Sequence, residues 1–304
     1  MASATPRIGF VGIGAMGAPM AACLIKAGYS VGVFDASPER GAAFEDQYGI
    51  KPAASLAALG EQSDVIITIL PNSAIVHDVL FGDHGLVSTL RPGAVVIEMT
   101  SGIPSQTVAF SERLAQQGVV LFDAPVSGGV PRARTGELTI MAGGNQADID
   151  AAMPILNALG KVIPTGGIGT GHAMKALNNL VSSAGFLIGI EALIIGSRFG
   201  IDPETMVDVL NVSTGMNNST QKKFKQYVLS RKFDSGFAMN LMVKDLTIAL
   251  GIAHENGVNA PFADLCRNLW SGASAVLGPQ ADHTAVALLS EQLAGMQIGK
   301  VANP

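Results

Sequence analysis

The sequence has few cysteines and few charged residues. Two cysteines, Cys23 and Cys266, occur among 304 residues, and charged residues make up 14% of the chain. Two cysteines form no disulfide framework, which fits a reducing, cytoplasmic compartment. The formal net charge of −5 argues against nucleic acid or an anionic membrane surface as a partner. We therefore expect a cytoplasmic protein that binds neither of them.

Patterns typical of a metal centre or a secretion signal are also lacking. The five histidines show no spacing typical of metal ligands, and no cluster of histidine, cysteine and carboxylate occurs along the chain. Residues 1–7 are too short and too polar for a signal peptide. The sequence therefore predicts no metal site and no cleaved leader.

Hydrophobic residues are abundant, at 48% of the 304 residues, and a chain of this length is expected to form two domains. Short apolar runs alternate with helix-length patterns in the first part, which predicts a mostly parallel sheet with helices on both faces. Only helical patterns follow later. We predict an α/β fold with a doubly wound Rossmann domain at 1–165 and an all-helical domain at 166–304. The expected strands are 7–11, 31–34, 64–70, 94–98, 119–123, 138–142 and 161–163.

A glycine-rich turn follows the first expected strand. Gly12-Ile13-Gly14-Ala15-Met16-Gly17 precedes a helical pattern, and the next strand ends on Asp35. In a dinucleotide site the three glycines permit the tight turn, the approach of the pyrophosphate and close helix–strand packing. Asp35 lies 23 positions after Gly12, near the spacing at which a carboxylate binds the adenosine ribose. The pattern predicts NAD, and NADP stays open because Arg40 could reach a 2′-phosphate.

Three further segments follow expected strands, namely Leu70-Pro71, Thr100-Ser101 and Ser127-Gly128-Gly129. Ligands of such sheets bind beyond the carboxyl ends of the strands, so all three are expected on the cofactor side. In the last segment, successive small residues expose backbone N–H groups that can receive a substrate carboxylate. Each segment is also compatible with a plain turn.

One apolar segment, residues 169–199, is expected to form a single long helix. Near its start Lys175, Asn178, Asn179 and Ser182 share one face, because residues three and four apart lie together on a helix. Apolar surroundings lower the pKa of a lysine and make its amine a proton donor or acceptor near neutral pH. The other interpretation is a lysine that extends to the surface beside two asparagines. Both stay open at this point.

The same helix is long enough to raise the question of a membrane span. Polar residues within it and the lack of a flanking basic cluster favour a buried helix of a soluble protein. We expect most of its apolar side chains to lie in the core, namely Met174, Leu177, Val181, Leu187, Ile188, Leu193 and Ile195.

The rest of the chain predicts helices and one polar loop. Residues 203–211 and 237–254 have helical patterns, and Asp202 is a plausible N-cap for the first. Residues 213–220 are expected to be a loop. Lysines 222, 223 and 225 are expected on a solvated face. Lys244 beside Asp245 is either a solvated pair or part of a site.

Four blocks of the sequence together resemble the β-hydroxyacid dehydrogenase family, which includes 3-hydroxyisobutyrate dehydrogenase. They occur in the family's order and span nearly the whole chain. The blocks are Gly9-Phe10-Val11-Gly12-Ile13-Gly14-Ala15-Met16-Gly17, Asp123-Ala124-Pro125-Val126-Ser127-Gly128-Gly129, Gly169-Thr170-Gly171-His172-Ala173-Met174-Lys175 with Asn178-Asn179, and Leu241-Met242-Val243-Lys244-Asp245-Leu246.

The resemblance implies an NAD(P)-dependent dehydrogenase that acts on the CH–OH group of a short 3-hydroxy acid. It implies that Lys175 is the catalytic proton-transfer group and that Asn179 and Lys244 hold the substrate, Lys244 also closing over the cofactor. It further implies that the Ser127-Gly128-Gly129 loop binds the substrate carboxylate, and that Leu70, Pro71 and Ser101 contact the cofactor. Members of the family are usually homodimers or homotetramers joined through their helices.

Two departures from the family pattern bear on the ribose contact of Ser101 and on the substrate, in that order. Glu98 stands where the family has aspartate, with Thr100-Ser101 in place of Ser-Thr, and Met216-Asn217-Asn218 stands where the family often has arginine and an aromatic residue. The alternatives are an imine or semialdehyde reductase of the same fold and a non-catalytic dinucleotide-binding protein.

Overall fold

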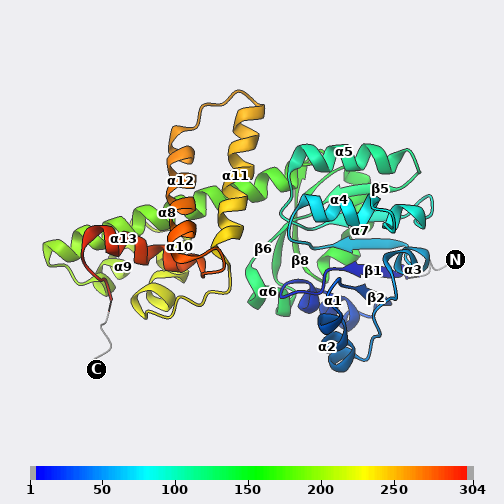
Figure 1. Cartoon of the computed structure of the whole chain (residues 1–304), viewed down its shortest axis with the longest axis horizontal. Helices are drawn as coiled ribbons and strands as arrows, with labels where there is room; N and C mark the ends of the chain where they lie inside the picture. Colours follow the sequence, from blue (N-terminus) through cyan, green and yellow to red (C-terminus); the bar gives the residue numbers. More distant parts are fainter. Residues whose placement is uncertain (1–4, 300–304) are drawn as a thin grey trace. The chain divides into compact units, whose positions relative to one another are not determined.

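The computed structural model describes residues 5–299 (Figure 1). Contacts divide the chain into two compact units, Met1–Lys175 and Ala176–Pro304. The division falls inside the 30-residue helix α8 (Thr170–Phe199), which therefore contributes to both units. The N-terminal unit is α/β and the C-terminal unit is helical, which confirms the predicted fold class.

The N-terminal unit is built on an eight-stranded sheet in the order β2-β1-β3-β4-β5-β7-β6, with β8 paired to β7. Strands β1 to β5 are parallel, whereas β7 runs antiparallel to β5 and β6. The carboxyl ends of β1, β3, β4 and β5 therefore meet at one edge. The strands are β1 (Ile8–Val11), β2 (Val31–Phe34), β3 (Val65–Thr68), β4 (Val95–Glu98), β5 (Val120–Asp123), β6 (Val126–Ser127), β7 (Leu138–Gly143) and β8 (Gly160–Gly166).

Each face of this sheet has its own hydrophobic core because alternate strand residues point to opposite sides. Ile8 and Phe10 of β1 pack into one core, and Val11 packs into the other. The first face is covered by α1 (Gly17–Lys26), α2 (Pro38–Tyr48), α6 (Gly129–Thr135) and α7 (Gln146–Asn157). The second is covered by α3 (Leu56–Gln62), α4 (Ser73–Phe81) and α5 (Pro104–Ala115), with a 3₁₀ turn at Leu86–Ser88 (Figure 1).

The C-terminal unit packs its helices around α8. Phe186, Ile190 and Leu193 of α8 are buried together with Phe224 and Trp270. The helices are α9 (Pro203–Asn211), α10 (Asn218–Lys222), α11 (Met239–Glu255), α12 (Pro261–Leu277) and α13 (Val286–Ala294), with a π-helix at Phe224–Leu229 and a 3₁₀ turn at His283–Ala285. Helices α11 and α12 lie side by side as a hairpin (Figure 1). The Asp202 carboxylate accepts a hydrogen bond from Thr205 N at 2.8 Å, which confirms this residue as the N-cap of α9.

The expectation that the apolar side chains of α8 are mostly core was wrong for five of seven residues. Leu187 and Leu193 are buried, but Val181, Ile188 and Ile195 are 74%, 57% and 69% exposed. The exposed residues recur every seven positions, so they form one stripe on a different face from Phe186, Ile190 and Leu193. Met174 and Leu177 are also exposed. Among residues 5–299, α8 is the helix that is long and apolar enough to span a bilayer, by length and composition alone.

The expected polar loop at 213–220 was wrong for its last three residues, 218–220. Helix α10 begins at Asn218, and its N-terminus has a capping box: the Asn217 side chain accepts from Thr220 N, and the Thr220 hydroxyl accepts from Asn217 N. The signal was present in the sequence as a capping residue, Asn217, three positions before the hydroxyl residue Thr220.

Candidate functional site

The turn after β1 has the geometry that its glycines predicted. Gly12 has a φ of +94°, and a Cβ there would lie 2.4 Å from the Ile69 carbonyl oxygen. A Cβ on Gly17 would lie 1.8 Å from the Gly12 carbonyl oxygen, so both positions require glycine for packing. A Cβ on Gly14 would have its nearest neighbour 3.8 Å away, on the Arg40 side chain. This glycine leaves open space over the turn, which fits the approach of a dinucleotide pyrophosphate to the N-terminus of α1.

Asp35 links the end of β2 to this glycine turn. Its carboxylate accepts hydrogen bonds from Ile13 N at 3.0 Å and Ser37 N at 2.9 Å. Arg40 lies 3.6 Å from the same carboxylate, and its own side chain is largely exposed. The buried carboxylate is thus fixed beside the turn, where an adenosine ribose would bind. The assignment of Asp35 to the ribose stays a prediction.

Two loops at the carboxyl ends of β3 and β4 are tied together by Thr100. Its hydroxyl accepts from Leu70 N at 2.9 Å, and its backbone N–H donates to the Glu98 carboxylate at 2.8 Å. Pro71 and Ser101 are the next residues of these two loops. The loops lie at the same sheet edge as the glycine turn, since β1, β3 and β4 are parallel neighbours. The structure therefore brings the predicted cofactor contacts of this unit to one edge.

Ser127 ends β6, and the two glycines after it lead into α6. Gly128 and Gly129 have φ values of +132° and +68°, and both are exposed. Two successive positive φ angles are readily adopted by glycine alone. The loop is therefore a defined strand-to-helix connection with accessible backbone. Its role in binding a carboxylate stays a prediction.

The first turn of α8 is fixed by a buried aspartate, Asp123, to which the sequence alone assigned no role. Lys175 follows one turn later on the same helix. Asp123 at the end of β5 accepts hydrogen bonds from Gly169 N at 2.6 Å and His172 N at 2.8 Å. Burial raises the pKa of Asp123, and the neighbouring His172 and the two N–H donors oppose this. Asp123 thus caps the helix from another element.

The glycines of the Gly169-Thr170-Gly171 segment permit this contact. Gly169 has a φ of +86°. A Cβ on Gly171 would lie 2.2 Å from the Met141 carbonyl oxygen and 2.7 Å from the Asp123 carboxylate. The helix can approach the sheet this closely because the second position lacks a side chain. Lys175 is half-buried on the turn that follows.

A second buried pair joins the same turn to β4. The His172 Nε2 atom lies 2.8 Å from Glu98 Oε2, and both side chains are almost fully buried. The sequence showed Glu98 only as a departure from the family pattern and gave no role to His172. The contact joins residues 74 positions apart, which periodicity and spacing do not reveal.

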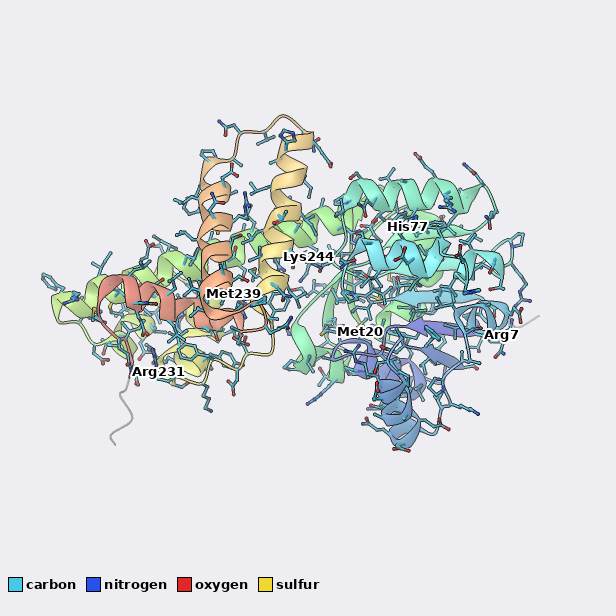
Figure 2. The ribbon with its side chains drawn as sticks, in the orientation of Figure 1. Arg7, Met20, His77, Arg231, Met239 and Lys244 are labelled. Atoms are coloured by element: carbon cyan, nitrogen blue, oxygen red, sulfur yellow. The ribbon has the colours of Figure 1, made fainter. Side chains whose placement is uncertain are left out.

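In the C-terminal unit, Asn179 is held by α11. Its amide donates to Asp245 Oδ2 at 2.5 Å and accepts from the Asn178 amide at 3.1 Å. Lys244 Nζ lies 3.6 Å from the other oxygen of Asp245, and Figure 2 shows this lysine on α11. Asp245 is only 2% exposed, so the interpretation of Lys244 and Asp245 as a solvated pair was wrong. The structure therefore brings Asn179 and Lys244 together through Asp245.

The lysine cluster after α10 is not a uniform solvated face either. Lys222 is exposed, but Lys223 is half-buried and donates to His283 Nε2 at 3.0 Å. Within residues 5–299, no group of three or more histidine, cysteine, aspartate or glutamate side chains could hold a metal ion.

Comparison with known proteins identifies the two parts of the chain. Residues 7–169 match the family model of the NAD-binding domain of 6-phosphogluconate dehydrogenase. Residues 169–290 match the model described as the NAD-binding part of NADP-dependent 3-hydroxyisobutyrate dehydrogenase. The chain is 36% identical to 2-(hydroxymethyl)glutarate dehydrogenase of Eubacterium barkeri, over 96% of this chain and 97% of that one. The chain belongs to the β-hydroxyacid dehydrogenase family.

Other members of the family support the same assignment. L-threonate dehydrogenase of Cupriavidus necator is 34% identical, over 92% of this chain and 94% of that one. The structure of Mycobacterium tuberculosis 3-hydroxyisobutyrate dehydrogenase with L-serine matches with a TM-score of 0.86 and 27% identity, over 94% of this chain and 99% of that one. The chain is thus an NAD(P)-dependent oxidoreductase of the β-hydroxyacid dehydrogenase type. The imine reductase and the non-catalytic alternatives are not favoured.

Proposed function

We propose that this β-hydroxyacid dehydrogenase oxidises the hydroxyl group of a short 3-hydroxy acid with NAD, using Lys175 as general acid and base. The observation that carries the proposal is the anchoring of α8 by Asp123, which fixes the start of the helix against the sheet and leaves Lys175 half-buried one turn later. The same unit contains the dinucleotide turn. A lysine in such a position is suited to accept or donate a proton near neutral pH.

Each remaining residue has a role in this proposal. The N–H groups and hydroxyl of Ser127-Gly128-Gly129 receive the substrate carboxylate, and Asn179 and Lys244 hold the substrate from the helical unit. The dinucleotide is held by residues of the N-terminal unit, namely Gly12 to Gly17, Asp35, Leu70, Pro71 and Ser101. Lys244 also contributes. Bound NAD supplies the hydride acceptor. Asp245, which binds the Asn179 amide, keeps that amide in a defined orientation.

Lys175 moves the proton of the reaction. The neutral amine accepts the proton of the substrate hydroxyl as the carbon is oxidised. In the reverse direction the ammonium group gives that proton back to the carbonyl oxygen. Such general acid–base catalysis contributes about 10² to 10⁴-fold.

NAD is proposed over NADP because of Asp35. Its carboxylate already accepts two backbone hydrogen bonds and would repel a 2′-phosphate. Arg40 favours NADP, since its exposed guanidinium lies near the carboxylate. The exchange Asp35→Ser should therefore shift the preference toward NADP.

The substrate is a small hydroxy acid, by the names of the relatives. These are dehydrogenases of 2-(hydroxymethyl)glutarate, L-threonate and 3-hydroxyisobutyrate, which all combine a hydroxyl group with a carboxylate. The segment Met216-Asn217-Asn218 departs from the family pattern, so the choice among these acids stays open.

We also propose that the protein is a cytoplasmic homodimer or homotetramer. The exposed stripe of α8 and the exposed apolar residues Phe262, Leu265 and Val276 of α12 support contact with a second copy. A membrane span is disfavoured because the other face of α8 is packed against protein, with Phe186 and Ile190 fully buried.

The decisive experiment measures initial rates with NAD and NADP on 3-hydroxyisobutyrate, 3-hydroxypropionate, glycerate, threonate, L-serine and 2-(hydroxymethyl)glutarate. Wild type is compared with Lys175→Ala, and Lys161→Ala, an exposed lysine on β8, is the matched control. We expect Lys175→Ala to lose at least about 100-fold in kcat, with NAD affinity nearly unchanged. An active Lys175→Ala enzyme, or one that loses NAD binding as well, would contradict the assignment of Lys175.

A further inference from the structure

The pair formed by Glu98 and His172 lies between the cofactor-side loop and the helix that carries Lys175. Glu98 is the last residue of β4, and His172 belongs to the first turn of α8. The distance from His172 Nε2 to Glu98 Oε2 is 2.8 Å, and the side chains are 0% and 2% exposed. A carboxylate and an imidazole in so dry a position interact much more strongly than a pair in water.

Glu98 binds a different element with each of its two oxygens. Its Oε1 accepts from Thr100 N at 2.8 Å, with the Thr68 hydroxyl at 3.4 Å, and Oε2 faces the imidazole. Thr100 in turn accepts from Leu70 N. One carboxylate therefore connects the two cofactor-side loops with the helix that carries the lysine.

The imidazole is also in contact with α5. The Thr107 hydroxyl lies 3.3 Å from the Ile103 carbonyl oxygen and 2.9 Å from His172 Nδ1. The other ring nitrogen, Nε2, faces Glu98 Oε2 at 2.8 Å. The ring is therefore fixed between α5 and the end of β4.

Asp123 fixes the same turn of α8 by a separate contact. It binds the backbone N–H groups of Gly169 and His172, whereas Glu98 binds the His172 side chain. The backbone hydrogen bonds to Asp123 hold the first turn of α8 against β5. The contact between Glu98 and the His172 side chain holds the same turn against β4. Gly102, in the loop after β4, lies against the imidazole, since a Cβ there would be 3.0 Å from His172 Cε1.

We propose that Glu98 and His172 are positioning residues for Lys175, a role that rests on the proposed function of this lysine. His172 precedes Lys175 by three residues, so the two share a helix face. A rotation or shift of this turn would move the amine relative to the Thr100-Ser101 loop. A misplacement of about 1 Å at a reacting group can reduce the rate about 100-fold.

Stability alone is a poor explanation for this pair. A buried ion pair contributes little net stability, because the loss of hydration offsets the attraction. The helix start already has its cap in Asp123. Removing one partner should still destabilise the fold, as in any buried pair, and the positioning role predicts a loss of turnover in addition.

The test compares Glu98→Gln, His172→Gln and the double variant with wild type. The matched control is Glu291→Gln, which removes another buried carboxylate from an ion pair, with Arg231, in the C-terminal unit. For each folded variant we measure kcat, KM, the Kd of NAD and the melting temperature. We expect each single variant to lose about ten- to 100-fold in kcat, with the KM of the acid and the Kd of NAD within about threefold.

The double variant separates positioning from general damage. Two glutamines can form a neutral hydrogen bond across the same gap, so the double variant should be more active than the product of the two single losses predicts. Glu291→Gln should lower the melting temperature and leave kcat unchanged. Wild-type kcat in both single variants would overturn the proposal, and so would losses of kcat and NAD binding in parallel. An inactive wild type, or an active Lys175→Ala variant, would contradict the proposed function itself. These measurements do not use the Glu98 and His172 variants, so this failure is distinguishable from a failure of the positioning role.

Discussion

The three glycines of the cofactor turn are required for different physical reasons. Gly12 and Gly17 are fixed by protein contacts, because a Cβ at either position would lie within 2.4 Å of a backbone carbonyl oxygen. A Cβ on Gly14 would meet no atom closer than 3.8 Å, and the φ of this residue lies outside the left-handed region. Protein contacts therefore do not require glycine here, and we expect the requirement to come from the dinucleotide.

Alanine substitutions should separate these two requirements. Gly14→Ala is expected to keep the melting temperature of wild type and to weaken NAD binding at least about tenfold, because the methyl group would occupy the approach to the pyrophosphate. Gly17→Ala is expected to lower the melting temperature. Thermal denaturation and NAD titration of both variants check this. A destabilised Gly14→Ala with normal NAD affinity would contradict the assignment.

His283 is a buried histidine kept neutral by its surroundings. Burial and the nearby Lys223 ammonium together lower its pKa to about 3, and Asp282 partly opposes them. The Lys223 ammonium donates to Nε2, so the ring accepts there and carries its proton on Nδ1. The unfolded chain binds a proton at this residue near pH 6.5, whereas the folded protein does not.

The folded protein should therefore lose stability as the pH falls below 6.5. The contribution of His283 is fully present above pH 6.5 and decreases by up to about 1.4 kcal/mol per pH unit as the pH falls toward 3. This predicts a loss of about 2 kcal/mol between pH 7 and pH 5. Urea denaturation at the two pH values measures it. His283→Gln should reduce the dependence, and His254→Gln, an exposed histidine, should not. An unchanged slope in His283→Gln would show that another group is responsible.

Motifs and chemistry predicted the candidate site residues from the sequence, but not the residues that support them. The glycine turn, Asp35 and Lys175 follow from local patterns of residues close in sequence. Asp123 and Asp245 act on partners 49 and 66 residues away. Their side chains look ordinary in the sequence, because a hydrogen bond across the fold leaves no periodic pattern.

Among the elements, α8 was predicted well in extent and poorly in burial. Its ends follow from local signals, Gly169 before it and Gly200 after it. The burial of its side chains does not follow from the sequence. An apolar side chain is equally hydrophobic whether it packs in the core of its own chain or against a second chain. The stripe of Val181, Ile188 and Ile195 became distinct from the core face only in the structure. Helix α10 was missed because five residues are too few for a periodic pattern.

At the scale of the whole molecule, the proposed chemistry is divided between the two units. The glycine turn, the Ser127-Gly128-Gly129 loop and Lys175 belong to the first unit, and Asn179 and Lys244 to the second. The relatives of the family match over nearly the full chain, so the two units occur together in them. Helix α8 is the continuous element that carries both Lys175 and Asn179.

The exposed stripe of α8 predicts how copies of the whole molecule associate. Apolar residues at a spacing of seven are typical of a helix that packs along another helix. Introducing a carboxylate there would place an unpaired charge in the contact, which is unfavourable. We therefore expect Ile188→Glu to shift the proposed dimer or tetramer toward monomer.

Light scattering during size-exclusion chromatography checks this association. Val212→Glu is the matched control, since Val212 is exposed in the same unit but lies outside α8. The wild type is expected at two or four times the chain mass, and Val212→Glu should match it. Ile188→Glu should elute with a smaller mass and keep its helical circular dichroism. A monomeric wild type would contradict the proposed oligomer, whereas an unchanged mass for Ile188→Glu would move the contact from α8 to the exposed residues of α12.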